Sequence, residues 1–130
     1  MHHLILNATD LVRSRRFYEW LMPRVGYDGT RAYDGTVGWF GAYGSFWLKQ
    51  EDPRFAADRF DKDRVGLCEI AFRAESRAQV DAVAKGLANV GARVLDPPRE
   101  YPYRPGYYAS SPTRTASSSS SSTFPRKRER

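Results

Sequence analysis

The sequence has one cysteine, two histidines and no long apolar segment among its 130 residues. Cys68 alone can form neither an intramolecular disulfide nor a zinc site built from several cysteines. The apolar runs, such as residues 46–48, are far shorter than the roughly 18 residues that a transmembrane helix needs. Residues 1–10 lack the basic start and the apolar core of a signal peptide. We therefore expect a cytoplasmic protein with no membrane partner.

Acidic residues are outnumbered, and the formal net charge is +6. Most of the excess lies in residues 110–130, which hold five basic residues against one acidic residue. A basic patch on a folded surface is therefore not indicated, and we do not expect nucleic acid as a partner. A nucleic-acid-binding tail at residues 126–130 is the weakest alternative.

Residues 110–130 have low complexity, with six consecutive serines at Ser117–Ser122 and a basic cluster after Pro125. No apolar periodicity is present, so the segment cannot bury enough surface to offset the entropy of ordering it. We predict a folded domain at residues 1–109 and a disordered Ser/Arg-rich tail at residues 110–130.

The first half of the domain reads as a strand, a helix and three further strands. Asp10 is a candidate N-cap, and Asp34-Gly35 is a strong hairpin signal. The predicted elements are a strand at His3–Asn7, a helix from Asp10 to about Pro23, strands at 30–33, 36–40 and 45–49, and a linker at 51–64.

The second half repeats this order. A strand is predicted at Gly66–Ala74, a helix capped by Ser76 and Gln79, and strands at 92–95 and 107–109 around a proline-rich loop. An offset of 66 residues aligns Asp10 with Ser76 and His3 with Glu69. The sequence therefore predicts an α+β fold of two βαβββ modules, at residues 1–50 and 65–109.

Residues 3–18 resemble the start of the vicinal oxygen chelate superfamily, and residues 66–72 and 91–98 resemble its second module. This superfamily contains glyoxalase I, bleomycin-resistance proteins, fosfomycin-modifying enzymes and extradiol dioxygenases. The resemblance spans residues 1–109 and implies paired modules that form a cup-shaped sheet. It also implies a homodimer and a small-molecule ligand, but it leaves the reaction open.

The resemblance further implies a divalent ion, Fe, Mn, Zn or Ni, held by His or Glu side chains on the first and last strands of the modules. His3 and Glu69 match two of these positions. The alternatives are an exposed imidazole beside His2 and a salt bridge from Glu69 to Arg73 or Arg93. Residues 45–49 offer no ligand, so a four-ligand glyoxalase site is not expected.

The third ligand of the superfamily lies on a final strand that is missing here. A GC-rich back-translation of Ser110–Pro125 reads, in the adjacent frame, as Phe-Ala-Asp-Pro-Asp-Gly-Ile-Lys-Leu-Glu-Leu-Val-Tyr-Val. We therefore interpret the C-terminus as a frameshift product, the alternative being a genuine disordered tail. On this interpretation the second sheet ends after Tyr108 and the chain is irregular beyond about Ser111.

Aromatic residues make up 14% of the sequence, and several are expected to line the cup. The loop Arg99–Gly106 combines prolines with tyrosine and arginine, which suits the rim of a ligand site. Packing in the core is the alternative for each aromatic residue. The predicted substrate-binding residues are Trp39, Trp47, Tyr101, Tyr103, Arg104 and Tyr107.

Two functions remain open at this point. The first is a metal-dependent lyase or dioxygenase that chelates two neighbouring oxygens of a small molecule through its metal. The second is a metal-free small-molecule binder of the bleomycin-resistance type. No catalytic residue is indicated.

Overall fold

The computed structural model describes residues 1–113 and 122–123. The described residues fall into two compact units, unit 1 at residues 1–60 and unit 2 at residues 61–113 with 122–123. Among them, no helix is long and apolar enough to cross a membrane.

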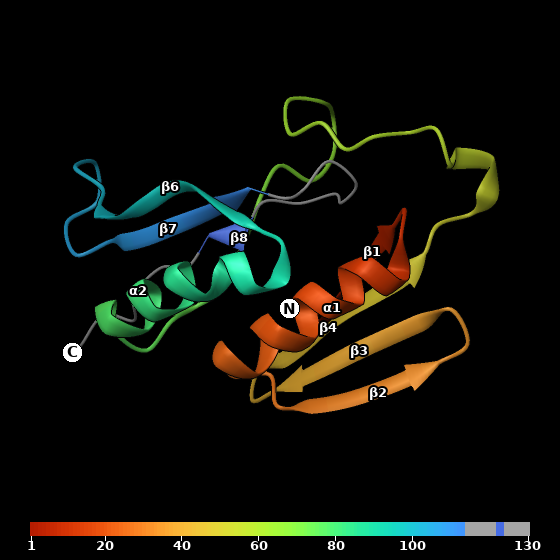
Figure 1. The fold of residues 1–130 in the computed structure, drawn as a ribbon, viewed down its shortest axis with the longest axis horizontal. Helices are drawn as coiled ribbons and strands as arrows, with labels where there is room; N and C mark the ends of the chain where they lie inside the picture. The colour runs from red at the N-terminus through yellow and green to blue at the C-terminus, as the bar shows by residue number, and fades with distance from the viewer. Residues whose placement is uncertain (114–121, 124–130) are drawn as a thin grey trace. The chain divides into compact units, whose positions relative to one another are not determined.

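Unit 1 is a four-stranded sheet with one helix. Its elements are β1 (His3–Ala8), α1 (Leu11–Arg24), β2 (Gly29–Tyr33), β3 (Thr36–Gly41), β4 (Gly44–Gln50) and a 3-10 turn at Pro53–Phe55. The strand order is β1-β4-β3-β2; β1 runs parallel to β4 and the other pairs are antiparallel. Helix α1 lies across one face of this sheet (Figure 1). The predicted order of unit 1 is confirmed.

Local sequence signals explain where these elements begin and end. Asp10 caps α1, since its carboxylate accepts a hydrogen bond of 3.1 Å from the Arg13 amide. The turn between β2 and β3 consists of Asp34 and Gly35, and Gly35 adopts a φ of +67°, which glycine tolerates best. The hairpin register is therefore fixed by its turn.

The core of unit 1 lies between α1 and the sheet. In β1 the exposed residues alternate with the more buried ones, as a sheet with one covered face requires. The side chains that are buried there are Phe17, Tyr18, Leu21 and Met22 of α1 and Val37, Trp39, Phe46 and Leu48 of the sheet. The opposite side of the sheet, termed the open face, carries His3, Ile5, Tyr33, Gly38, Phe40, Ser45 and Trp47.

Unit 2 follows the same element order. It comprises β5 (Ile70–Ala71), α2 (Arg77–Gly86), a 3-10 turn at Leu87–Val90, β6 (Arg93–Glu100), β7 (Tyr108–Thr113) and β8 (Ser122–Thr123). Strands β6 and β7 are antiparallel, β5 and β8 are parallel, and β8 lies beside β7. The parallel pairing of first and last strand therefore occurs in both units.

Helix α2 forms as its sequence predicts. The Ser76 hydroxyl accepts a hydrogen bond of 3.1 Å from the Gln79 amide, and the Gln79 side chain accepts one from the Glu75 amide. Gly91 ends the helical segment with a φ of +74°. The predicted inward face is confirmed, because Val80, Val83, Ala84 and Leu87 are all buried.

Strand lengths in unit 2 differ from the prediction. The strand expected at Gly66–Ala74 is paired as a strand only at Ile70–Ala71. Conversely, β6 runs through Pro97 and Pro98, which were expected in a loop. The register of β6 against β7 shifts between Asp96 and Arg99, so both prolines lie where the ladder is irregular and their missing amide hydrogens are tolerated.

The second sheet does not end after Tyr108, so this prediction is wrong. Strand β7 continues to Thr113, where it pairs with Arg93, and the buried Ser110 hydroxyl donates a hydrogen bond of 3.0 Å to the Asp96 carbonyl. The last strand is short rather than missing, since Ser122 and Thr123 pair with Ile70 and Ala71. Strands pair through backbone hydrogen bonds, which do not require apolar side chains. These residues have no apolar alternation, so the sequence alone does not predict that they pair.

The rest of the predicted tail, residues 114–121 and 124–130, lies outside the described residues. The frameshift interpretation of this segment therefore stays a prediction, and the sequence of the gene tests it directly.

Two leucine substitutions in unit 2 test the assignment of its core. Leu87 is 1% exposed and Leu95 is 66% exposed. We expect Leu87→Ala to lower the free energy of unfolding by about 2–5 kcal/mol through the cavity that it leaves. Leu95→Ala should change it by less than about 0.5 kcal/mol. Urea unfolding followed by circular dichroism measures both, and equal losses would contradict the core described here.

Candidate functional site

Three aromatic rings cover the open face of unit 1. The Trp47 ring stacks with Tyr33 at 6.1 Å between centroids and 20° between planes. Phe40 meets Trp47 edge to face at 5.3 Å. The Trp47 indole nitrogen donates a hydrogen bond of 2.9 Å to the Ser45 hydroxyl, which helps to fix the orientation of the ring. We term Tyr33, Phe40 and Trp47 the aromatic platform.

Gly38 makes room for this platform. It lies opposite Trp47 in the ladder between β3 and β4. A Cβ atom at Gly38 would clash with Cε3 of the Trp47 ring, so any other residue at this position would force the indole to move. The indole therefore rests directly on the backbone of β3, and the close approach of ring and strand is built into the sequence.

Trp39 does not belong to the open face, and the prediction that it binds substrate is wrong. It is 1% exposed and packs beside Tyr18 and Phe46 on the side of α1. The ladder pairs Trp39 with Phe46 and Gly38 with Trp47. Because successive strand residues alternate between faces, Trp39 and Trp47 must point in opposite directions.

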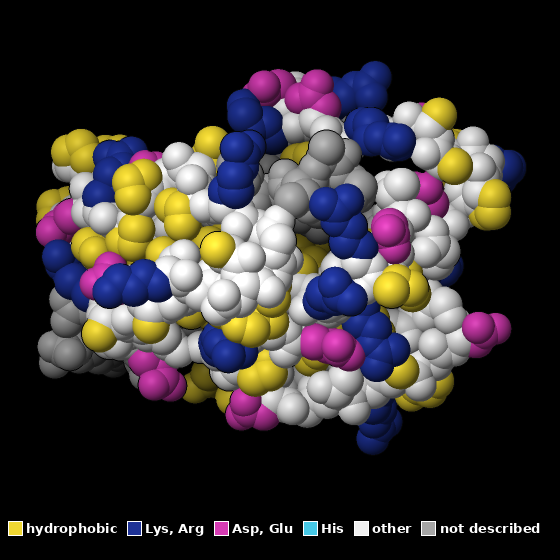
Figure 2. Space-filling view, in the orientation of Figure 1, with side chains coloured by type: hydrophobic (Ala, Val, Ile, Leu, Met, Phe, Trp, Pro, Cys, Tyr) yellow, Lys and Arg dark blue, Asp and Glu magenta, His cyan; other side chains and the backbone are white. Residues whose placement is uncertain are grey.

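The structure brings together the aromatic residues that were predicted in the loop of unit 2. Tyr101 lies 5.5 Å from both Tyr103 and Tyr107 between ring centroids. The Arg104 guanidinium stands over the Tyr107 ring at 5.1 Å. We term Tyr101, Tyr103 and Tyr107 the tyrosine cluster. Figure 2 shows hydrophobic and basic side chains intermixed at this end of the β6–β7 hairpin.

Backbone hydrogen bonds hold the tyrosine cluster in a tight turn. The Tyr101 amide donates to the Tyr107 carbonyl, and the Tyr107 amide donates to the Arg104 carbonyl, both at 2.9 Å. The Gly106 amide donates to the Glu100 carboxylate at 2.8 Å. The loop is therefore confined to residues 101–107, between the end of β6 and the start of β7.

Asp96 organises the base of this hairpin, which sequence reasoning missed. Its carboxylate accepts two hydrogen bonds from Arg99, at 3.0 and 3.1 Å, and a third from the Tyr101 hydroxyl. The bonds from Arg99 and then Tyr101 lower the pKa of the Asp96 carboxyl. Burial and the hydrogen bond to Asp96 raise the pKa of Tyr101 to about 12. Tyr101 is therefore a neutral donor at physiological pH.

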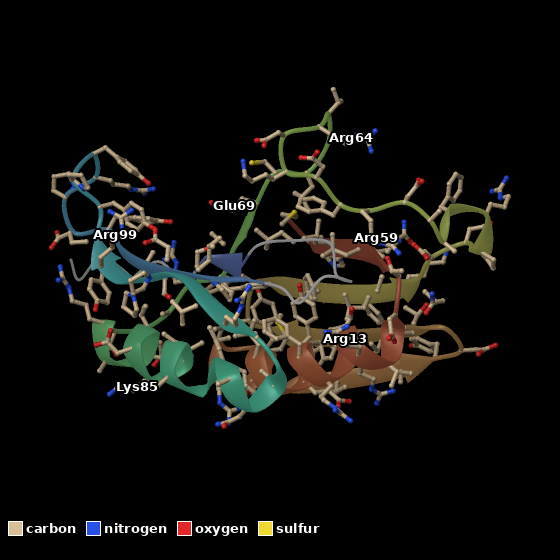
Figure 3. The ribbon with its side chains drawn as sticks, turned by 45° about the horizontal axis from the view of Figure 1, so that its top comes forward. Arg13, Arg59, Arg64, Glu69, Lys85 and Arg99 are labelled. Carbon is tan, nitrogen blue, oxygen red and sulfur yellow. The ribbon has the colours of Figure 1, made fainter. Side chains whose placement is uncertain are left out.

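Glu69 lies immediately before β5 and is exposed. Figure 3 shows it on the segment that leads into β5. It forms no ion pair with another described residue, so a salt bridge with Arg73 or Arg93 is not observed in that part of the chain. Burial and then the Glu69 charge raise the pKa of Tyr107, which places this carboxylate in the electrostatic environment of the tyrosine cluster.

His3 occupies the corresponding place in unit 1. It precedes Leu4, which pairs with β4, as Glu69 precedes Ile70, which pairs with β8. In each unit the residues two and four positions after Leu4 or Ile70 are the more buried ones on the helix side. His3 and Glu69 therefore share the strand parity that points away from the helix.

These residues fit a metal ion only in part. His3 supplies an imidazole and Glu69 a carboxylate, both donor types that Zn, Fe, Mn and Ni accept. On the open face β4 presents Ser45 and Trp47, and neither is a usual ligand. Within residues 1–113 and 122–123, no three His, Cys, Asp or Glu side chains gather as a metal-binding group. The described residues thus provide two donors and no complete set.

Comparisons with known proteins place the chain in a family. No model of a known protein family matches the sequence. The chain is 35% identical over 95 residues to the uncharacterized protein YqjT of Bacillus subtilis, a match that covers 73% of this chain and 74% of YqjT. The chain therefore belongs to the same family as YqjT, and its fold is that of the vicinal oxygen chelate superfamily.

Solved structures agree on the fold. A glyoxalase candidate from Bacillus halodurans superimposes with a TM-score of 0.82 at 24% identity, over 98% of this chain and 95% of that chain. A glyoxalase/bleomycin resistance protein from Albidiferax ferrireducens gives 0.76 at 17% identity, over 98% of each chain. Lactoylglutathione lyase from Agrobacterium tumefaciens gives 0.65 at 18% identity, over 97% of this chain and 92% of that chain. The expected glyoxalase-like fold is confirmed.

Removing the Tyr101 hydroxyl tests the electrostatics of the hairpin. A tyrosine ordinarily has a pKa of 10.0, whereas the pKa of Tyr101 in the folded protein is about 12. Deprotonation therefore favours the unfolded state between these two values, and the free energy of unfolding falls as the pH rises from 10 to about 12. We expect Tyr101→Phe to lack this loss and to remove the phenol that ionises near pH 12 from the phenolate absorbance titration. Tyr43→Phe, at a fully exposed site, is the control. The pKa of Tyr107 and that of Tyr108 are raised as well, so some late absorbance remains; an unchanged amplitude near pH 12 in Tyr101→Phe would disprove the assignment.

Proposed function

We propose that this protein binds a small planar oxygenated molecule on the open face of unit 1, without needing a metal to do so. The observation that supports this most directly is the aromatic platform, whose Trp47 ring lies on Gly38. Flat ligands stack on such rings, and a stacked pair contributes about 0.5–1.5 kcal/mol beyond the burial of its area.

The exposure of the platform supports a ligand rather than a purely structural role. Tyr33 is 61% exposed and Ile5, two residues after His3, is 53% exposed. Exposed apolar groups that gather on one face of a sheet, when the other face is covered, often mark a binding surface. Nearby polar groups could orient oxygen atoms of a ligand: the Ser45 hydroxyl and the Arg31 guanidinium, which lies 5.6 Å from the Phe40 ring.

The residue on β4 separates this proposal from a metal enzyme. The superfamily's glyoxalase members carry a ligand on this strand, whereas this chain has Trp47 there. An aromatic side chain at that position supports the metal-free mode of binding. In unit 2, the tyrosine cluster and Arg104 stay predicted ligand contacts by themselves. The homodimer implied by the resemblance stays part of the proposal.

Binding of 4-nitrocatechol in the presence of EDTA tests this function. We expect the full chain to bind this coloured probe, with a shift in its absorbance and quenching of tryptophan fluorescence. Trp47→Ala should weaken binding at least about tenfold, because one stacking surface is lost. Gly38→Val should weaken it similarly, by displacing the indole without removing it.

Trp20→Ala is the matched control, because Trp20 lies on α1 and is covered by Arg24 at 4.5 Å. Unchanged affinity in Trp47→Ala, or an equal loss in Trp20→Ala, would contradict a site on the aromatic platform.

A metal-dependent enzyme is the second candidate, supported by the equivalent positions of His3 and Glu69. In this candidate His3 and Glu69 would each serve as a ligand of a divalent ion, Fe, Mn, Zn or Ni. The ion would act as a Lewis acid towards substrate oxygens. Around Glu69, Tyr107 and Arg104 could bind a polar substrate, while Tyr101 would keep its proton and act as a hydrogen-bond donor.

Elemental analysis of tag-free protein distinguishes the candidates. The metal enzyme predicts about one equivalent of ion per chain, and a loss of that ion in both His3→Ala and Glu69→Gln, since each removes a ligand. Glu75→Gln, an exposed glutamate of the same unit, should retain it. Protein that remains metal-free after growth and refolding with each of the four ions would exclude this candidate.

A further inference from the structure

The four strands of unit 1 carry basic residues and no acidic ones. Strands β1, β2, β3 and β4 contain no aspartate or glutamate, whereas β2 contains Arg31 and β4 contains Lys49. Arg31 lies on the open face, because it is the ladder partner of Gly38. Lys49 follows Trp47 by two residues and has the same parity. The face that carries the aromatic platform is therefore cationic.

The Trp47 ring extends from its own strand towards Arg31. The ring atoms that lie nearest Gly38 belong to the six-membered ring of the indole, so the ring crosses β3. It also stacks with Tyr33, which lies on β2 two residues after Arg31. The guanidinium of Arg31 lies 5.6 Å from the centre of the Phe40 ring. Arg31 therefore stands at the border of the platform.

Arg31 has no acidic partner within residues 1–60. The side chain is exposed and forms no ion pair in that range. Asp28 and Asp34 flank β2 in the sequence, but neither pairs with it. A guanidinium presents five N–H donors in a planar fork and keeps its charge at every physiological pH. These donors remain available to an anion beside the flat aromatic surface.

Lys49 is less suited to the same role. Asp52 follows β4, and the pKa of its carboxyl is lowered by the backbone and side-chain hydrogen bonds from Arg54 and then by the charge of Lys49. That carboxylate offsets part of the lysine charge. An ammonium group also acts as a point charge, whereas a guanidinium matches both oxygens of a carboxylate at once.

We propose that the ligand of the aromatic platform is a planar aromatic carboxylate, whose ring stacks on Trp47 and whose carboxylate binds Arg31. The assignment rests on the proposed function and narrows its ligand to an anionic class. A carboxylate that is conjugated with a ring lies in the plane of that ring. The ring can therefore stack while both oxygens accept parallel hydrogen bonds from the guanidinium at its edge.

Two probes with the same ring separate charge from stacking. We compare 4-nitrobenzoate with its neutral amide, 4-nitrobenzamide, by calorimetry on the full chain at neutral pH in EDTA. We expect the parent to bind the carboxylate at least about fivefold more tightly, because only this probe accepts charged hydrogen bonds from Arg31. Added NaCl should reduce the preference, since exposed charges are screened by salt.

Substitutions of Arg31 test the residue itself. Arg31→Gln should abolish the preference for the carboxylate and change binding of the amide by less than about twofold. Arg31→Lys keeps the charge without the fork and should retain part of the preference. Arg24→Gln is the matched control, because Arg24 is also exposed and lies over an aromatic ring, that of Trp20 on α1. It should keep the full preference.

The outcomes separate this assignment from the proposed function. A parent that binds both probes equally, or neither of them, overturns the carboxylate assignment. A preference that persists in Arg31→Gln, or that is lost equally in Arg24→Gln, overturns it too. In each of these cases the proposed function still stands if Trp47→Ala weakens binding of 4-nitrocatechol. Unchanged binding of the amide and of 4-nitrocatechol in Trp47→Ala overturns both.

Discussion

Within each unit, the parallel pairing of the first and last strands decides which side chains lie on the face of the sheet away from the helix. In unit 1, β1 runs beside β4 over six residue pairs, from His3 with Ser45 to Ala8 with Gln50. These partners are 42 residues apart in the chain. Their register decides that His3, Ser45 and Trp47 share one face while Leu48 and Phe46 line the core. The side of the sheet on which the aromatic platform lies follows from it.

The sequence carried strong signals for local structure. Asp10 and Ser76 mark the starts of both helices, and Asp34-Gly35 marks the hairpin, because capping and tight turns depend on a few neighbouring residues. The repeat at an offset of 66 residues predicted the two βαβββ modules. The alternation in β1 then places His3 on the face away from α1, and the same parity holds for Glu69.

Properties that depend on distant residues were harder to foresee. Trp39 and Trp47 look alike as aromatic strand residues, and only the register between β3 and β4 separates core from open face. The register of β3 against β4 could have been counted from the turn at Ala42-Tyr43, and that of β2 against β3 from Asp34-Gly35, which would also have found Tyr33. The part that Asp96 plays depends on Arg99 and Tyr101, which lie close to it in the sequence, and on the irregular pairing around Pro97 and Pro98.

The two units repeat one plan with very different lengths of parallel ladder. Six residue pairs join β1 to β4, whereas within the described residues two join β5 to β8. Amide hydrogens exchange with solvent when a ladder opens locally, and a ladder of two pairs opens with far less loss of cooperative bonding than one of six. Amide exchange should therefore be faster at Ile70 and Ala71, next to Glu69, than in the middle of β1.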